Sequence, residues 1–227
     1  MDANGIPIFD PIPPKAASLF RDELALAERG KYMRMWERPE YHRYSPGAYH
    51  APLAIAALGM KPGATLYDLG CGNGQAVPIL AAHGLLVRAV DIAMTPALAA
   101  WAADKTKHLP VDRRPVFTGA CLWAIPLHWP RRDYVFCCDV LEHIPPARVD
   151  SVLVHVKRLM RRGGYLNIHC APDGCGALIG ETLHLTVERP EWWMAKLGAH
   201  FFVERHEAPP SELTCVVRPK PEAAHVR

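Results

Sequence analysis

Residues 66–74 read LYDLGCGNG, an apolar run that reaches an acidic residue and then breaks into three glycines on alternate positions. This pattern predicts a β-strand followed by a tight turn, because glycine adopts positive φ angles that are costly for other residues. A second apolar run, residues 85–90, ends at Asp91, and a carboxylate there suits a ribose, whose hydroxyls are donors. Together the segments predict a nucleoside-binding site; a tight turn without a ligand is the simpler alternative.

The spacing of these glycines indicates which nucleoside binds. A dinucleotide-binding turn reads G-x-G-x-x-G and directs a helix N-terminus at a pyrophosphate, but Gln75 stands where its third glycine would be. Asp68 would repel a pyrophosphate, whereas its carboxylate can accept a hydrogen bond from an ammonium group. S-adenosylmethionine (SAM) carries an ammonium, a sulfonium and a ribose but no phosphate, so it fits the pattern better.

Residues 68–74 resemble motif I of the class I SAM-dependent methyltransferases, (D/E)-x-G-x-G-x-G. The resemblance covers about residues 60–218. It implies that the glycine turn lies under the methionine part of SAM and that the acidic residue after the second strand holds the ribose. By position, the expected cofactor-binding residues of these two segments are Asp68, Gly70, Cys71, Gly72, Gly74 and Asp91.

Strand and helix patterns alternate and predict an α/β fold: a Rossmann-like, seven-stranded, mostly parallel sheet with helices on both faces and a C-terminal antiparallel hairpin. The expected strands are residues 64–69, 85–91, 114–118, 133–139, 165–170, 200–206 and 212–218. The expected helices are 15–36, 51–58, 74–83, 95–105, 146–161, which Gly163 and Gly164 end, and 189–197. We expect an N-terminal helical and aromatic lid (1–59), a SAM-dependent methyltransferase domain (60–218) and a flexible tail (219–227).

The composition is that of a globular protein. The 227 residues are 50% hydrophobic and 22% charged, which is typical of globular domains, and a net charge of +3 does not by itself indicate a nucleic-acid or membrane partner. The seven cysteines form no C-x-x-C pair, so we expect reduced thiols. The sequence shows no secretory signal and no run of transmembrane length, and it therefore predicts a cytoplasmic protein without a membrane partner.

The remaining cofactor contacts are expected at the carboxyl ends of other strands, where ligands bind in open α/β sheets. Class I methyltransferases commonly carry an acidic residue near the adenine after the third strand, and this chain has Cys121 there. Backbone groups of Cys121 and Leu122 are expected to hold the adenine, with Ile92 or Trp123 against its face.

The N-terminal segment is rich in aromatic residues and is the expected lid. Aromatic rings can cover a sulfonium by cation–π contact and exclude water. We expect Tyr44 and Ser45 to touch the cofactor, and packing of the rings on the sheet is the alternative. The rings of the expected lid are those of Tyr32, Tyr41, Tyr44, Tyr49 and His50.

Residues 139–144 read DVLEHI and resemble a segment found across many small-molecule methyltransferases. The resemblance implies that Asp139 lies beside the methionine part of SAM and that Glu142 and His143 face the acceptor. An imidazole with an ordinary pKa near 6.5 can take a proton as the methyl arrives, so Glu142 and His143 are the candidate catalytic residues. Bracing of the loop is the alternative role for both side chains.

The same residues allow a metal site as a further alternative. The D-x-x-E-H spacing is similar to the E-x-x-E-H of ubiquinone-pathway O-methyltransferases and small-RNA 2′-O-methyltransferases, where two carboxylates and a histidine help to hold a divalent ion. His184 would supply a further ligand. The first carboxylate here is an aspartate, one methylene shorter, so no residue is assigned to a metal.

Basic clusters at residues 113–114, 131–132 and 157–162 each precede a strand, at the edge opposite the expected cofactor site, so nucleic acid is not the expected partner. The sequence predicts a SAM-dependent methyltransferase that acts on an O or N of a small organic acceptor. The alternatives are a metal-assisted O-methyltransferase acting on a hydroxyl (an RNA 2′-OH or a quinone-type phenol), an RNA- or protein-directed enzyme, and a non-catalytic SAM-binding partner protein. The oligomeric state is left open.

Overall fold

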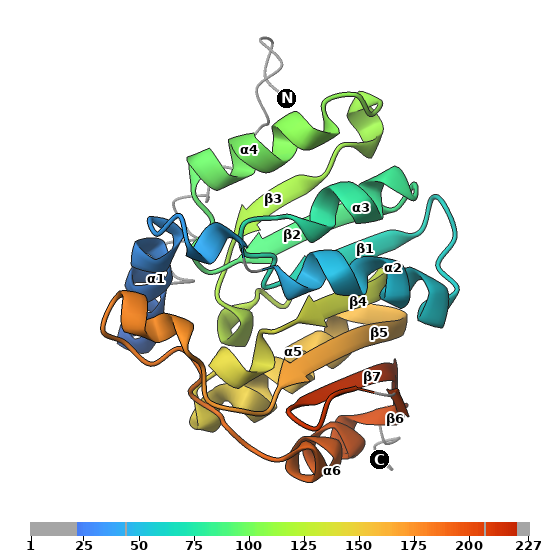
Figure 1. The fold of residues 1–227 in the computed structure, drawn as a ribbon. Helices are drawn as coiled ribbons and strands as arrows, with labels where there is room; N and C mark the ends of the chain where they lie inside the picture. The colour runs from blue at the N-terminus through green and yellow to red at the C-terminus, as the bar shows by residue number, and fades with distance from the viewer. Residues whose placement is uncertain (1–21, 44, 207, 222–227) are drawn as a thin grey trace.

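The structure is a computed structural model that describes residues 22–43, 45–206 and 208–221 (Figure 1). One sheet of seven strands has the order β3-β2-β1-β4-β5-β7-β6. β7 pairs antiparallel with both of its neighbours, and the other pairs are parallel, so the expected fold class is confirmed. The strands are β1 (Thr65–Leu69), β2 (Leu86–Asp91), β3 (Val116–Gly119), β4 (Arg132–Cys138), β5 (Met160–His169), β6 (Phe201–His206) and β7 (Glu212–Pro219).

Helices cover both faces of the sheet (Figure 1). On one face, α2 (Pro46–Leu58), α3 (Ala76–Ala82) and α4 (Pro96–Thr106) bury apolar side chains against β1, β2 and β4. On the other face, α5 (Val149–Leu159) and α6 (Pro190–His200) do the same. The short 3₁₀ helices are η2 (Tyr41–Arg43), η3 (Val111–Arg113), η4 (Leu122–Ala124), η5 (Leu141–His143), η6 (Pro146–Arg148) and η7 (Cys175–Leu178).

Local signals set the ends of two helices. Thr95 caps α4, because its hydroxyl accepts a hydrogen bond from Leu98 N at 3.2 Å. Gly59 ends α2 in the left-handed conformation, with φ of 56°. α2 begins at Pro46, earlier than expected, because proline fits the first helical turn, where its missing N–H costs nothing.

The expectation that Gly163 and Gly164 end a helix is wrong. α5 ends at Leu159, and both glycines lie inside β5. A Cβ on Gly163 would lie 2.8 Å from the Val217 carbonyl oxygen of β7, so the glycine permits close approach of two strands. Glycine in this position serves packing between β5 and β7.

α1 (Glu23–Trp36) lies beside the carboxyl ends of the strands, next to the segment that follows β5 (Figure 1). Asp22 caps α1, and its carboxylate accepts a hydrogen bond from Leu24 N at 3.0 Å. Residues 15–21 of the expected first helix lie outside the described residues. None of the helices in the described part of the chain has the length and apolar character needed to cross a membrane.

Candidate cofactor and acceptor site

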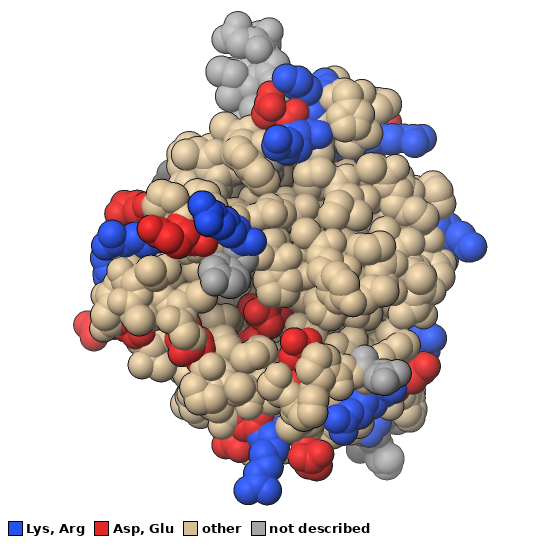
Figure 2. Space-filling view, in the orientation of Figure 1, with Lys and Arg blue, Asp and Glu red and all other residues tan. Residues whose placement is uncertain are grey.

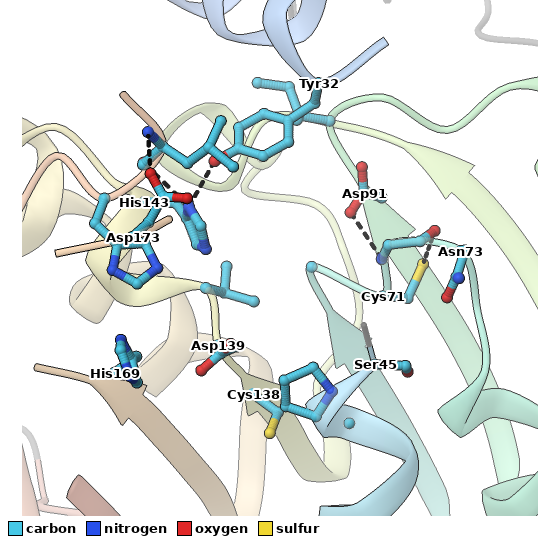
Figure 3. Close-up of a pocket in the computed structure, with 18 of the residues that line it drawn as sticks. Tyr32, Ser45, Cys71, Asn73, Asp91, Cys138, Asp139, His143, His169 and Asp173 are labelled. Atoms are coloured by element: carbon cyan, nitrogen blue, oxygen red, sulfur yellow. Dashed lines mark hydrogen bonds between the residues drawn. The ribbon is translucent and has the colours of Figure 1, made fainter. Parts of the chain in front are cut away.

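A cavity of about 370 Å³ is lined by residues from the carboxyl ends of β1, β2, β4 and β5 and from α1. Figure 2 shows this face of the molecule hollowed, with acidic side chains recessed in the hollow. In Figure 3, Asp91 and Asn73 lie across one space from His143, Asp139 and His169. The expected site residues that line the cavity include Asp68, Gly70, Cys71, Gly72, Asp91, Ile92, Leu122, Asp139 and His143.

The glycine turn after β1 is drawn tightly against the sheet. Gly70 has φ of 75°, and the amides of Gly70 and Cys71 donate to the Val90 carbonyl oxygen at 2.7 and 3.0 Å. A Cβ on Gly70 would lie 2.3 Å from Val140 Cγ2, so a side chain does not fit there. Gly74, with φ of 73°, closes the turn by donating to the Cys71 carbonyl oxygen and does not line the cavity.

Asp91 ends β2 with its carboxylate fixed by the main chain. Oδ2 accepts a hydrogen bond from Gly72 N at 2.9 Å, and Oδ1 accepts one from Ala93 N at 2.8 Å. Burial raises the pKa of Asp91, although these two hydrogen bonds act in the opposite direction. Each oxygen keeps a further lone pair, which is what a pair of ribose hydroxyls requires.

Asp68 is a buried carboxylate without a counter-charge. It is 2% exposed, and Oδ2 has no hydrogen-bond partner among the described residues. Burial, together with the neighbouring Asp91, raises the pKa of Asp68 to about 8. Because an unpaired buried carboxylate is costly, this position fits an ammonium group as its partner.

Cys121 and Glu142 do not line the cavity. Cys121 is buried before η4, and Leu122 and Trp123 line the cavity in its place. Glu142 is also buried, and its Oε1 accepts a hydrogen bond from His169 N at 2.9 Å. The Glu142 geometry matches the bracing alternative and differs from the expected contact with the acceptor, because the carboxylate is used to hold the end of β5.

His143 does line the cavity, and its Nδ1 lies 2.6 Å from the Tyr32 hydroxyl and 3.1 Å from the Leu183 carbonyl oxygen. Burial, with a contribution from His184, lowers the pKa of His143 to about 3. The ring is therefore neutral near pH 7 and is a much weaker proton acceptor than a free imidazole. This differs from the expectation of a general base and leaves hydrogen bonding or metal binding as its chemistry.

Glu142, His143 and His184 offer ligand atoms that all lie within 4.8 Å of one another. Nδ1 of His184 donates to the Ala171 carbonyl oxygen at 2.6 Å, which leaves a lone pair on Nε2. Histidines that bind metals usually have such a partner on the other ring nitrogen. The three side chains therefore fit a divalent ion, and Asp139 is not part of the group.

The N-terminal elements form one wall of the cavity. Tyr44 lies outside the described residues. Tyr49 is 71% exposed, and His50 instead forms a hydrogen bond with the Tyr165 hydroxyl at 2.8 Å, so neither of these lid residues lines the cavity. The lining residues from this part of the chain include Tyr32, Trp36, Tyr41 and Ser45.

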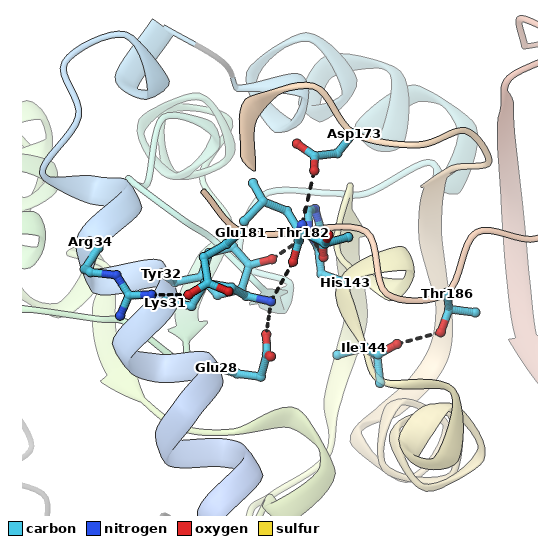
Figure 4. Close-up of polar contacts among 11 residues, drawn as sticks. Glu28, Lys31, Tyr32, Arg34, His143, Ile144, Asp173, Glu181, Thr182 and Thr186 are labelled. Carbon is cyan, nitrogen blue, oxygen red and sulfur yellow. Dashed lines mark hydrogen bonds and ion pairs between the residues drawn. The ribbon is translucent and has the colours of Figure 1, made fainter. Parts of the chain in front are cut away.

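Polar contacts tie α1 to the segment after β5 (Figure 4). Nζ of Lys31 lies 2.6 Å from Glu28 Oε2 and donates to the Thr182 carbonyl oxygen at 3.0 Å. Arg34 forms an ion pair with Glu181. These contacts close one side of the cavity with parts of the chain that are distant in sequence.

Sequence reasoning missed several lining residues. Asn73 lies between two glycines of the motif, and this place was the available signal; its side chain donates to the His42 carbonyl oxygen at 3.1 Å. No motif marks Glu28 and Trp36 of α1 or Phe136 of β4, which also line the cavity.

A seven-stranded sheet of this order, with a nucleoside-sized cavity over its glycine turn, defines the Rossmann-like methyltransferase fold. Residues 67–166 match the family model of a methyltransferase domain. Residues 67–166 are therefore a SAM-dependent methyltransferase domain.

Individual relatives agree with this family. The chain is 35% identical over 101 residues to magnesium protoporphyrin IX methyltransferase from Arabidopsis thaliana, over 44% of this chain and 31% of that protein's length. The Burkholderia thailandensis 1,6-didemethyltoxoflavin-N1-methyltransferase, solved with S-adenosylhomocysteine, has a TM-score of 0.62 at 20% identity, covering 92% of this chain and 91% of that one. Magnesium protoporphyrin IX methyltransferase from Synechocystis PCC 6803 has a TM-score of 0.58 at 22% identity, covering 89% and 99%.

Proposed function

We propose that this chain binds SAM in the cavity and transfers its methyl group to an oxygen or nitrogen of a small organic acceptor. The pairing of Asp68 and Asp91 at the ends of neighbouring strands carries the proposal. Asp68 would accept hydrogen bonds from the ammonium of SAM, and Asp91 from its ribose hydroxyls. Ile92 and Leu122 would flank the adenine.

For methyl transfer from SAM, the main task of the protein is to align the acceptor atom with the methyl carbon. The acceptor atom attacks the methyl carbon, the bond from carbon to sulfur breaks, and S-adenosylhomocysteine leaves. Because the sulfonium is already a good leaving group, proximity and exclusion of water supply most of the rate. We also propose that residues 60–218 are the catalytic domain, that residues 1–59 are its lid, and that the protein works in the reducing cytoplasm, where seven free thiols persist.

Calorimetry with SAM and S-adenosylhomocysteine tests the proposal directly. Both compounds are expected to bind the full chain, and Asp68→Asn is expected to weaken binding because the amide cannot offer a charge to the ammonium. Asp112→Asn, at an exposed position on η3, is the matched control and should bind as the native chain does. Failure of both compounds to bind at millimolar concentration would remove the proposal.

A metal-assisted O-methyltransferase is a second candidate, favoured by the convergence of Glu142, His143 and His184. A divalent ion there would polarise a hydroxyl acceptor. Calorimetry with Mn²⁺ and Zn²⁺ should then show binding that His184→Ala removes and that His108→Ala, at an exposed position, leaves intact. Full methyl transfer in excess EDTA would rule out this mechanism.

A further inference from the structure

The walls of the cavity carry several ionisable carboxylates. Within the described part of the chain, no lysine or arginine lines the cavity. Figure 2 shows acidic side chains recessed in the hollow, with lysines and arginines on the outer surface. Any acceptor must therefore tolerate a negative potential. The carboxylates that line the cavity belong to Glu28, Asp68, Asp91, Asp139 and Asp173.

Tyr41 lies in the wall of the cavity, among these carboxylates. Burial is the largest cause that raises the pKa of Tyr41, and Asp91, Asp139 and Asp173 add to the shift. A carboxylate or phosphate placed beside this ring would meet the same repulsion that disfavours a phenolate.

Two basic side chains of α1, those of Lys31 and Arg34, are already paired. Nζ of Lys31 lies 2.6 Å from Glu28 Oε2 and also donates to the Thr182 carbonyl oxygen. Arg34 forms an ion pair with Glu181. Lys31 therefore offsets the charge of Glu28 alone. The other four carboxylates of the cavity take part in no ion pair among the described residues. Asp68 and Asp91 are assigned above to the ammonium and the ribose of SAM, so Asp139 and Asp173 remain for the acceptor.

Two histidine rings in the cavity wall, His169 and His184, offer hydrogen-bond acceptors in addition to the carboxylates. The Ala171 carbonyl oxygen accepts from Nδ1 of His184 at 2.6 Å and from Nδ1 of His169 at 3.3 Å. A ring that donates from Nδ1 in its neutral tautomer carries a lone pair on Nε2, and both rings line the cavity. N–H donors on an acceptor molecule complement these atoms, whereas a carboxylate would face lone pairs.

We propose, building on the function proposed above, that the acceptor is an amine-bearing small molecule and that carboxylate and phosphate compounds are excluded. The bound ammonium gives one proton to water, and the nitrogen lone pair then forms a bond with the methyl carbon of SAM. The electrons of the broken carbon–sulfur bond stay on sulfur. The products are the N-methylated ammonium and neutral S-adenosylhomocysteine.

Matched adenosyl probes test the charge preference without knowledge of the natural acceptor. In each probe a nitrogen replaces the sulfur of S-adenosylhomocysteine and carries a 2-aminoethyl, a 2-hydroxyethyl or a carboxymethyl arm. Calorimetry with the full chain should give the tightest binding for the aminoethyl arm, at least about tenfold tighter than for the carboxymethyl arm, a difference of about 1.4 kcal/mol. Asp139→Asn should narrow this ratio, whereas Asp150→Asn, in an exposed pair with Lys196 on the outer surface, should not.

Equal or tighter binding of the carboxymethyl arm would overturn the proposed acceptor class while leaving SAM binding in place. An unchanged preference for the aminoethyl arm in Asp139→Asn would also overturn the proposed acceptor class, because the preference would then not come from the carboxylate of Asp139. If S-adenosylhomocysteine itself does not bind, the proposed function fails first and this inference fails with it.

Discussion

The hydroxyl of Tyr32 lies 2.6 Å from Nδ1 of His143 and joins α1 to the loop after β4. The same nitrogen lies 3.1 Å from the Leu183 carbonyl oxygen, which can only accept. Nδ1 therefore carries the proton of the neutral ring, and Nε2 is left with a lone pair. The Leu183 carbonyl oxygen thus fixes the tautomer of a ring that lines the cavity, and the Tyr32 hydroxyl oxygen is a second acceptor for the same proton.

Replacement of Tyr32 by Phe keeps the ring and removes this hydrogen bond. We expect the free energy of unfolding in urea to fall by about 1 kcal/mol, the usual net value of a buried hydrogen bond. Tyr49→Phe is the control, because Tyr49 is 71% exposed. An equal loss in both variants would show that the Tyr32 contact contributes nothing. Long-range ¹H–¹⁵N spectra should in addition show the Nδ1–H form of His143 in the native chain.

Asp68 predicts a pH dependence of stability. Its pKa is about 8 in the folded chain against an ordinary value of 3.8, so the folded state binds more protons between these limits. The free energy of unfolding therefore receives a contribution that falls as pH rises through this window. Urea unfolding from pH 5 to 8 should show a less negative slope in Asp68→Asn, while Asp112→Asn should keep the native slope.

SAM binding should show the opposite pH trend. The ammonium of SAM needs an ionised Asp68, so binding must release the proton that the free site holds below pH 8. Affinity should rise with pH between 5.5 and 7.5, and calorimetry in buffers of different ionisation enthalpy should detect the proton. Binding without proton release would indicate that Asp68 does not contact the ammonium.

The parts of the site that could be predicted from the sequence are those that local geometry decides. A strand that stops before a glycine turn places Asp68 and Gly70 at a strand end whatever the rest of the chain does. The same holds for Asp91, because β1 and β2 pair in register. Their positions follow from a short stretch of backbone and from the rule that parallel strands share one carboxyl edge.

The remaining site residues depend on tertiary packing. Lys31 and Thr182 are 151 positions apart, and no local pattern indicates that they touch. The burial of Glu142 and the low pKa of His143 likewise arise from the segment after β5, which covers them. A glycine in the sequence does not always mark a helix end. Gly163 is needed instead because β7 approaches the backbone of β5 closely at this position.

Substitutions at Gly70 and Gly63 distinguish the cost of backbone strain from the cost of a steric clash. Both have positive φ, 75° and 86°, but a Cβ on Gly63 would meet nothing within 4 Å, whereas one on Gly70 would lie 2.3 Å from Val140. Gly63→Ala should lower the free energy of unfolding by about 1 kcal/mol. Gly70→Ala should cost clearly more and also weaken binding of S-adenosylhomocysteine. Adding Val140→Ala should restore part of the loss in Gly70→Ala; no restoration would point to strain alone.

Lys31 and Glu28 form a nearly buried pair, with side chains 5% and 11% exposed, at the contact between α1 and the segment after β5. Lys31→Met leaves the Glu28 carboxylate without its cation and should cost about 3 kcal/mol in urea unfolding. The double variant Glu28→Gln, Lys31→Met removes that uncompensated charge and should recover much of the loss. Lys107→Met, in an exposed pair with Asp104, should cost under about 1 kcal/mol. A double variant no more stable than Lys31→Met would mean that the hydrogen bond to Thr182, and not the charge of Glu28, makes Lys31 necessary.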